Sequence, residues 1–237
     1  MIIPKMRWSR LLMAVFVLGS IGAVLWRSPL FGAEPPVVIA PPAFDNPKAP
    51  GTPQTAVIAG GCFWGVQGVF EHVRGVQRVV AGYAGGDRLT AHYETVSTGT
   101  TGHAESVKIT FDPAVVSYGQ LLQIAFSVVY DPTQLNRQGP DVGTQYRSAI
   151  FYADDSQRQI AEAYISQLDK SHAFPRPIVT RVDPLKGFFQ AEDYHQDYLI
   201  NNPNTPYIAI YDIPKIENLK RMFAELYSGR PVLARLN

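Results

Sequence analysis

Residues 55–65 read Thr55-Ala56-Val57-Ile58-Ala59-Gly60-Gly61-Cys62-Phe63-Trp64-Gly65 and carry the clearest structural signal in the chain. Its first five residues form an apolar run of strand length, and Cys62, Val66, Val69 and Val73 then recur at helical spacing. The two glycines between the run and the helix let the backbone turn sharply. The stretch therefore predicts a strand, a tight turn and a helix, with a thiol at the start of the helix.

Cys62 is the only cysteine among the 237 residues. At a helix start it lies beside unpaired backbone N–H groups and the positive end of the helix dipole, so we expect a thiol pKa below the free value of about 8.5. A lone cysteine is often a small buried hydrophobe; the glycine turn and the adjacent Phe63 and Trp64 favour a nucleophile instead. A single cysteine excludes an intrachain disulfide and a cysteine-based zinc site.

Glu105 is the second candidate for a site. In the predicted strand it shares the face of Val107, Ile109 and Phe111, so an acid lies where the alternation requires a hydrophobe. Burial would raise its pKa and keep it protonated, as a proton donor needs. The first residue of a strand can equally point toward solvent, and the pattern alone leaves both readings open.

The sequence resembles the A-type peptide methionine sulfoxide reductases, whose signature is Gly-Cys-Phe-Trp-Gly, here residues 61–65. Further segments of the family occur in the family's order at 82–86, 93–96, 101–105, 143–148 and 191–196. The resemblance covers roughly residues 55–211. The N-terminal segment and the C-terminal tail lie outside it.

The resemblance implies a role for each matching residue. Cys62 matches the nucleophile and Glu105 the catalytic acid, which decides between the two readings of Glu105. Tyr93 and Tyr146 match tyrosines whose hydroxyls bind the sulfoxide oxygen, although half-buried packing describes most tyrosines. Asp141 matches an acid that helps to order water and substrate. Phe63 and Trp64 are expected to form the apolar pocket for the methyl group. His195 also lies in a matching segment and is expected to support the substrate or to hydrogen-bond at the surface.

The reaction implied by the resemblance is thiol-dependent reduction of methionine S-sulfoxide, free or in oxidised proteins, through a Cys62 sulfenic acid. No cofactor or metal is implied. Many relatives carry downstream cysteines that capture the sulfenic acid, but residues 216–237 contain none. The expected reductant is therefore an external thiol, either a thioredoxin-like protein or a small thiol.

The N-terminal residues 1–33 read as a signal peptide or a membrane anchor. Lys5, Arg7 and Arg10 precede the uncharged run 11–26, and Arg27 ends it. As a helix the run spans about 24 Å, short of the roughly 30 Å hydrocarbon core, while bulky Phe31 makes a poor cleavage site. Cleavage and anchoring both stay open. In either case we expect a periplasmic protein, soluble or tethered to the inner membrane.

Residues 34–53 contain seven prolines and predict a semi-rigid linker. The catalytic domain is expected over 54–237, as a monomer. Outside the basic N-terminus, 17 basic side chains (21 less four) face 20 acidic ones, which argues against nucleic acid as a partner.

The domain's predicted elements suggest an α+β sandwich. Strands are expected at 55–59, 76–83, 104–111, 146–152 and 178–183, helices at 62–73, 117–130, 155–170, near 190–200 and at 214–227, and a polar loop at 131–145. The resemblance implies a two-layer, ferredoxin-like architecture.

Two other functions fit fewer of these residues. A Cys–His acyl-transfer enzyme could pair Cys62 with His103 or His195, but the sequence lacks a hydrolase signature around the cysteine. An inert binding domain displayed on the linker would have no reason to retain Cys62, Glu105 and both tyrosines.

Overall fold

Strand β1 (Gln54–Ala59) lies inside a six-stranded sheet and leads directly into helix α1 (Phe63–Glu71). The structure is a computed structural model that describes residues 32–48 and 50–234. The predicted export segment therefore lies almost wholly outside the described residues. No helix within 32–48 and 50–234 is long and apolar enough to cross a membrane.

The other strands of the sheet are β2 (Val76–Ala84), β3 (Ala104–Phe111), β6 (Ala149–Tyr152), β7 (Arg181–Pro184) and β8 (Phe188–Gln190). The sheet order is β7-β6-β1-β3-β2-β8, and all neighbours are antiparallel except β6 and β7. The main helices besides α1 are α3 (Tyr118–Ile124), continued by a π-helical turn (Ala125–Val129), α4 (Asp155–Lys170) and α6 (Ile213–Met222). Shorter elements are α2 (Tyr93–Val96), β4 (Arg137–Gln138), β5 (Asp141–Val142) and α5 (Tyr198–Asn201).

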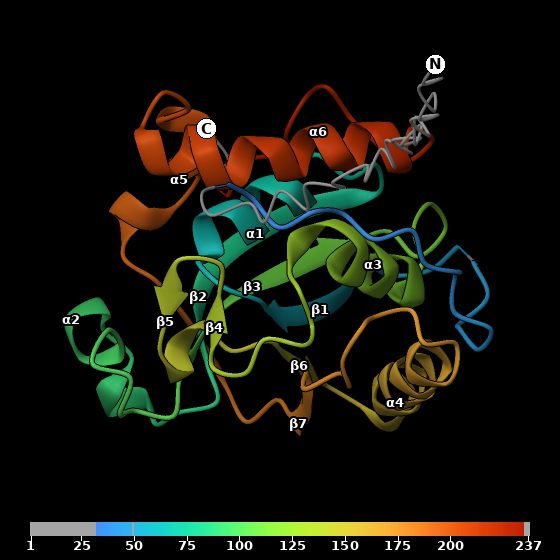
Figure 1. The fold of residues 1–237 in the computed structure, drawn as a ribbon, viewed down its shortest axis with the longest axis horizontal. Helices are drawn as coiled ribbons and strands as arrows, with labels where there is room; N and C mark the ends of the chain where they lie inside the picture. Colours follow the sequence, from blue (N-terminus) through green and yellow to red (C-terminus); the bar gives the residue numbers. More distant parts are fainter. Residues whose placement is uncertain (1–31, 49, 235–237) are drawn as a thin grey trace, which may run out of the picture. The chain divides into compact units, whose positions relative to one another are not determined.

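The central four strands and two helices form two interleaved βαβ units. Strand β1, α1 and β2 make the first unit, and β3, α3 and β6 make the second, with the order β6-β1-β3-β2 in the sheet (Figure 1). This is the split βαβ arrangement of ferredoxin-like folds. The predicted α+β, two-layer, ferredoxin-like architecture is confirmed.

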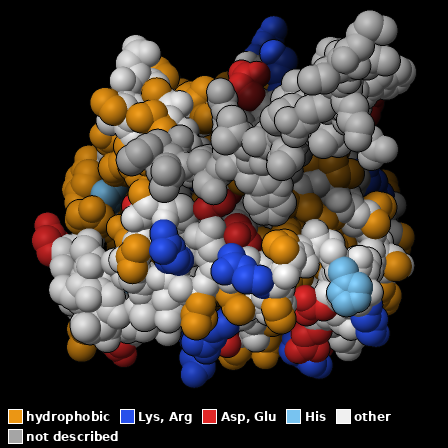
Figure 2. Space-filling model, viewed as in Figure 1, with side chains coloured by type: hydrophobic (Ala, Val, Ile, Leu, Met, Phe, Trp, Pro, Cys, Tyr) orange, Lys and Arg blue, Asp and Glu red, His pale blue; other side chains and the backbone are white. Residues whose placement is uncertain are grey.

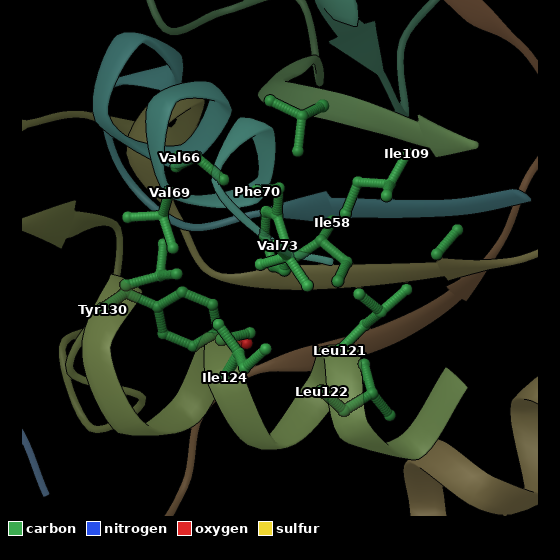
Figure 3. Packing of buried hydrophobic residues seen from close by; sticks show 14 of the residues in the cluster. Ile58, Val66, Val69, Phe70, Val73, Ile109, Leu121, Leu122, Ile124 and Tyr130 are labelled. Atoms are coloured by element: carbon green, nitrogen blue, oxygen red, sulfur yellow. The ribbon is translucent and has the colours of Figure 1, made fainter. Parts of the chain in front are cut away.

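Helices α1 and α3 cover one face of the sheet and form the main core with it. Ile58 of β1 and Ile109 of β3 project toward Phe70 of α1 and Leu121 of α3 (Figure 3). All four side chains are fully buried, because period-2 alternation in the strands and helical spacing in α1 aim their apolar side chains at the same layer. This packing fixes the start of α1, and with it Cys62, against β3.

The structure adds elements that the sequence did not indicate. The polar loop expected at 131–145 contains the β4–β5 hairpin, and β8 pairs with the edge of β2. The helix expected near 190–200 is a single 3-10 turn (Asp193–His195) followed by α5. These are short pieces stabilised by tertiary neighbours rather than by their own periodicity.

The proline-rich segment packs against the domain. We call residues 32–48 the N-terminal strap. Its Val37 N–H donates to Ser127 O at 2.9 Å, its Ala40 carbonyl accepts from the Tyr164 hydroxyl at 2.8 Å, and its Ile39 side chain is buried in the core. The expected linker would instead stand free of the domain. The segment docks because an extended chain leaves its backbone carbonyls unpaired, and side chains of α3 and α4 donate hydrogen bonds to them.

Candidate active site

Cys62 is the N-cap residue of α1, at the end of the turn that leaves β1. Gly61 has φ of +93°, a conformation that L side chains rarely adopt, so the turn requires glycine there. The Cys62 side chain is partly exposed. The predicted placement of a thiol at the helix start is confirmed.

Gly65, in the first turn of α1, lies directly against a buried acid. A Cβ atom at Gly65 would overlap the carboxylate of Asp212, which is fully buried and paired with Lys215 at 3.1 Å. Glycine at position 65 therefore lets Asp212 come close to the start of α1. The result is a buried acid near Cys62 that lies far along the chain.

Glu105 is buried in β3, at 3% exposure, and its Oε2 accepts a hydrogen bond of 3.0 Å from the backbone N–H of Phe63. Burial raises the pKa of this carboxyl to about 8, although the Phe63 N–H opposes the shift and Asp141 adds to it. At neutral pH the carboxyl is mostly protonated. The pattern-based placement on the apolar face and the raised pKa both agree with the structure.

The predicted low pKa of Cys62 is wrong. Burial raises the pKa of the Cys62 thiol well above its ordinary value, the acids Glu105 and Asp212 raise it further, and the Trp64 backbone N–H lowers it only in part. The sequence shows the helix start but not the acids gathered around it. Cys62 is thus a thiol in the resting protein, and it becomes a thiolate only as it reacts.

Tyr93, Tyr146 and Asp141 lie around the same two groups. Burial raises the pKa of both phenols, and the Glu105 carboxyl raises both further. Burial also raises the pKa of Asp141, which accepts a hydrogen bond from the Tyr207 hydroxyl. Both phenols therefore stay protonated and can donate to an oxygen that gains negative charge.

An aromatic cluster builds the apolar side of the site. The Trp64 ring stacks on Tyr198 with centroids 3.9 Å apart, meets the edge of Tyr207, and donates its Nε1–H to His195 Nδ1 at 3.1 Å. Phe63 is buried, and its ring centroid lies 5.0 Å from that of His195. Trp64 is therefore held on three sides.

His195 is a buried residue of this cluster, not a surface hydrogen-bonder. Only 2% of it is exposed, and burial lowers its pKa, so the ring is neutral and Nδ1 accepts from Trp64. His103 uses both ring nitrogens on backbone groups of Gly86 and Asp87. Among the described residues no hydrogen bond joins either histidine to Cys62, so the structure gives no support to an acyl-transfer enzyme.

Sequence reasoning missed Tyr207 and Glu192. Tyr207 touches both Trp64 and Asp141, but it lies in a segment without a chemical motif. Glu192 accepts from the Tyr83 hydroxyl at 2.8 Å and from the Tyr93 N–H at 2.9 Å, and so joins β2 to α2. Only its position in the family-like segment 191–196 could have pointed to a role for Glu192.

Within the part of the chain that the structure describes, no group of three His, Cys, Asp or Glu side chains is arranged to hold a metal ion. The side chains that converge are one thiol, one protonated carboxyl, phenol donors and an apolar aromatic wall. This set can bind a small polar S=O group beside a methyl group and bring a nucleophile and a proton to it.

Comparisons with known proteins agree with this chemistry. The profile of the family described as "Peptide methionine sulfoxide reductase" matches residues 54–226. The chain belongs to this family. It is an oxidoreductase that reduces the S-sulfoxide of methionine, with thiols as the source of electrons, and so acts in protein repair.

Two relatives illustrate how similar the chain is. It is 61% identical over 189 residues to "Peptide methionine sulfoxide reductase MsrA 2" of Mesorhizobium japonicum, covering 80% of this chain and 96% of the relative. It is 52% identical to a protein of the same description from Synechocystis, covering 79% of this chain and 89% of the relative.

Two solved structures share the fold. Methionine sulfoxide reductase A of Corynebacterium diphtheriae has a TM-score of 0.57 and 33% identity, covering 75% of this chain and 90% of that one. Mxr1 from Saccharomyces cerevisiae in reduced form has a TM-score of 0.58 and 30% identity, covering 69% and 92%.

Proposed function

We propose that this enzyme reduces methionine S-sulfoxide by transfer of the sulfoxide oxygen to Cys62, with Glu105 as the proton donor. The observation that carries the proposal is the pairing of a helix-start thiol with a buried acid whose pKa is about 8, joined through the Phe63 N–H. An acid that keeps its proton at neutral pH can donate it to the sulfoxide oxygen.

The reaction at Cys62 balances without an added oxidant or reductant. The Cys62 sulfur attacks the sulfoxide sulfur while Glu105 protonates the oxygen, and Glu105 regains a proton from the thiol. The hydroxyl then passes from the substrate sulfur to the Cys62 sulfur: a new S–O bond forms on Cys62 while the S–S bond made by the attack and the S–O bond of the substrate break. Methionine leaves, and Cys62 is left as a sulfenic acid. Tyr93 and Tyr146 donate to the oxygen as its charge grows, and Phe63 and Trp64 contact the methyl group.

The enzyme is then regenerated by two external thiols. The first condenses with the sulfenic acid, forms a mixed disulfide with Cys62 and releases water. The second attacks this disulfide, frees Cys62 and leaves as the oxidised dithiol pair. The absence of a second cysteine in the sequence supports an external resolving thiol, from a thioredoxin-like protein or a small thiol.

The site of action proposed is the periplasm. The basic flank and uncharged run of residues 1–33 support export, with the body released or tethered at the inner membrane.

Acidic and basic side chains are interspersed on the face seen in Figure 2, so this face lacks the basic patch that nucleic-acid binding would need.

The test is incubation with each epimer of a methionine sulfoxide peptide plus dithiothreitol, followed by product detection. Methionine from the S epimer alone is the expected result. Equal turnover of both epimers, or turnover by Cys62→Ser, would contradict the proposal.

A further inference from the structure

Helix α2 carries Tyr93 but has little packing of its own to fix its position. It is a single turn of four residues, of which Val96 is the buried one. Figure 1 shows it at the edge of the domain, outside the two main layers. Because an isolated helix of this length is not stable in water, the position of the Tyr93 phenol depends on the hydrogen bonds that attach α2 to the rest of the domain.

The start of α2 is attached by Glu192. The Glu192 carboxylate accepts from the Tyr93 N–H at 2.9 Å and from the Tyr83 hydroxyl at 2.8 Å. Tyr83 belongs to β2, so this acid ties the first residue of α2 to the sheet. One attachment point leaves the other end of the short helix free to swing.

The other end is attached by the 3-10 turn that ends in Tyr146 (Thr144–Tyr146). The Thr144 hydroxyl donates to Gly99 O at 2.5 Å, and Gln145 Nε2 donates to Ser97 O at 3.2 Å. We call these two bonds the clamp. It joins the residues that follow α2 to the turn that carries the second phenol of the site.

The clamp is continuous with Tyr93. Ser97 donates its backbone N–H at 2.8 Å and its hydroxyl at 2.6 Å to the Tyr93 carbonyl, so a displacement of Ser97 also displaces Tyr93. The Glu105 carboxyl contributes to the raised pKa of both Tyr93 and Tyr146, which places the two phenols around one acid. The clamp therefore sets how these phenols stand relative to each other.

The Gln145 side chain fits its place closely. It is 5% exposed, and a Cβ atom at Gly143 would lie 2.2 Å from its Oε1. Among the described residues this buried Oε1 has no hydrogen-bond partner. A buried acceptor without a partner costs free energy, and an apolar side chain of similar volume would avoid that cost. The amide is therefore explained by the bond that its nitrogen makes and not by a gain in stability.

We propose that Thr144 and Gln145 are positioning residues, which hold Tyr93 where it and Tyr146 can donate to the same sulfoxide oxygen. They act through Tyr93 and not on the substrate. The inference rests on the proposed function, in which both phenols donate to the oxygen as its charge grows. Because a displacement of about 1 Å can remove much of a group's effect on the rate, loss of the clamp should lower kcat more than it changes KM.

The experiment is a double-mutant cycle in the full chain, because a role through Tyr93 and a general effect on the fold predict different outcomes. Thr144→Val and Gln145→Met remove the two donors with little change of volume, and Tyr93→Phe removes the phenol. Thr144→Ser keeps the hydroxyl and tests rescue. Single turnovers over a range of S-sulfoxide concentrations give the maximal rate of methionine formation and the half-saturating concentration separately.

The variant Thr144→Val/Gln145→Met should lower the maximal rate on the order of tenfold and change the half-saturating concentration less than about threefold. Tyr93→Phe should lower the rate on the order of 10²-fold, as loss of a donor to a charged oxygen does. In that background the clamp substitutions should have no further effect. Thr144→Val alone should show a smaller loss of the same kind, and Thr144→Ser should restore the rate.

A clamp variant as fast as wild type, or one that slows the Tyr93→Phe enzyme as much as it slows wild type, would overturn the inference. So would a Thr144→Ser enzyme as slow as Thr144→Val. If the double variant does not fold, Thr144→Val, at a partly exposed position, carries the same cycle. A Tyr93→Phe enzyme with the wild-type rate would instead contradict the role of Tyr93 in the proposed function.

Discussion

Replacement of Glu105 by glutamine removes the acidic carboxyl proton and keeps the shape of the side chain. The glutamine keeps the volume of the buried side chain, and its amide oxygen can still accept from the Phe63 N–H that now donates at 3.0 Å. With Glu105 at 3% exposure, a shorter replacement would add a cavity to the comparison. Glu105→Gln therefore isolates the proton donor.

The pKa of about 8 sets the size of the effect. About nine-tenths of the Glu105 carboxyl is protonated at pH 7 and about one-tenth at pH 9, so the contribution of the acid should fall about tenfold between them. Loss of a general acid costs on the order of 10²- to 10⁴-fold. The variant should show that loss at pH 7 and should lack the decline controlled by the acid at higher pH.

The assay is a single turnover with limiting S-sulfoxide and no reductant, quenched at intervals and analysed for methionine. At low substrate concentration its pH profile reports groups of the free enzyme, which are the groups seen in this structure. The Cys62→Ser protein gives the background. A Glu105→Gln rate within threefold of wild type at pH 7, or a profile that still declines near pH 8, would refute the assignment of Glu105 as the acid.

Four further predictions follow from the same contacts. Alkylation of Cys62 by iodoacetamide should give an apparent pKa above that of an ordinary thiol, because burial and Glu105 disfavour the thiolate; a value below 8 would contradict this. His195→Phe should raise KM about fivefold by removing the acceptor for Trp64, whereas His195→Gln, which retains an acceptor, should not; equal KM values would show that the bond is dispensable. Burial and Asp197 raise the pKa of Glu71 to about 10, so the folded state keeps a proton that the unfolded state releases near 4.5. The contribution of Glu71 to the free energy of unfolding, measured in urea as the difference between wild type and Glu71→Gln, should be fully present below about pH 4.5 and should fall by up to about 1.4 kcal/mol per pH unit as the pH rises toward 10; a difference that does not change with pH would rule this out. A reporter joined after Pro53 should be active only when it is one that works in the periplasm, and activity confined to a cytoplasmic reporter would overturn the export proposal.

Local patterns predicted the parts of the site that depend on local geometry. The apolar run, the glycine turn and the helical spacing around Cys62 placed the thiol at the start of α1, and strand alternation placed Glu105 on the buried face. Both follow from the two side-chain periodicities of regular structure. The same patterns gave most elements of the ferredoxin-like core.

The properties that depend on distant segments could not be read in this way. The pKa of Cys62 is raised partly by Asp212, which arrives from the start of α6, and His195 is buried because Trp64 and Phe63 close over it. The strap shows the same limit: its prolines predicted an extended chain, but the donors that dock it belong to α3 and α4. No local sequence signal reports such pairings.

Oxygen transfer to Cys62 is tested by a single turnover of the full chain without reductant, followed by measurement of the intact mass. With one equivalent of the S epimer, one methionine should form per protein, and the mass should rise by about 16 Da, one oxygen, which a sulfenic acid reagent should locate at Cys62. The R epimer should leave the mass unchanged. Methionine formed without any mass gain at Cys62, or a mass gain with Cys62→Ser, would show that Cys62 does not take up the oxygen.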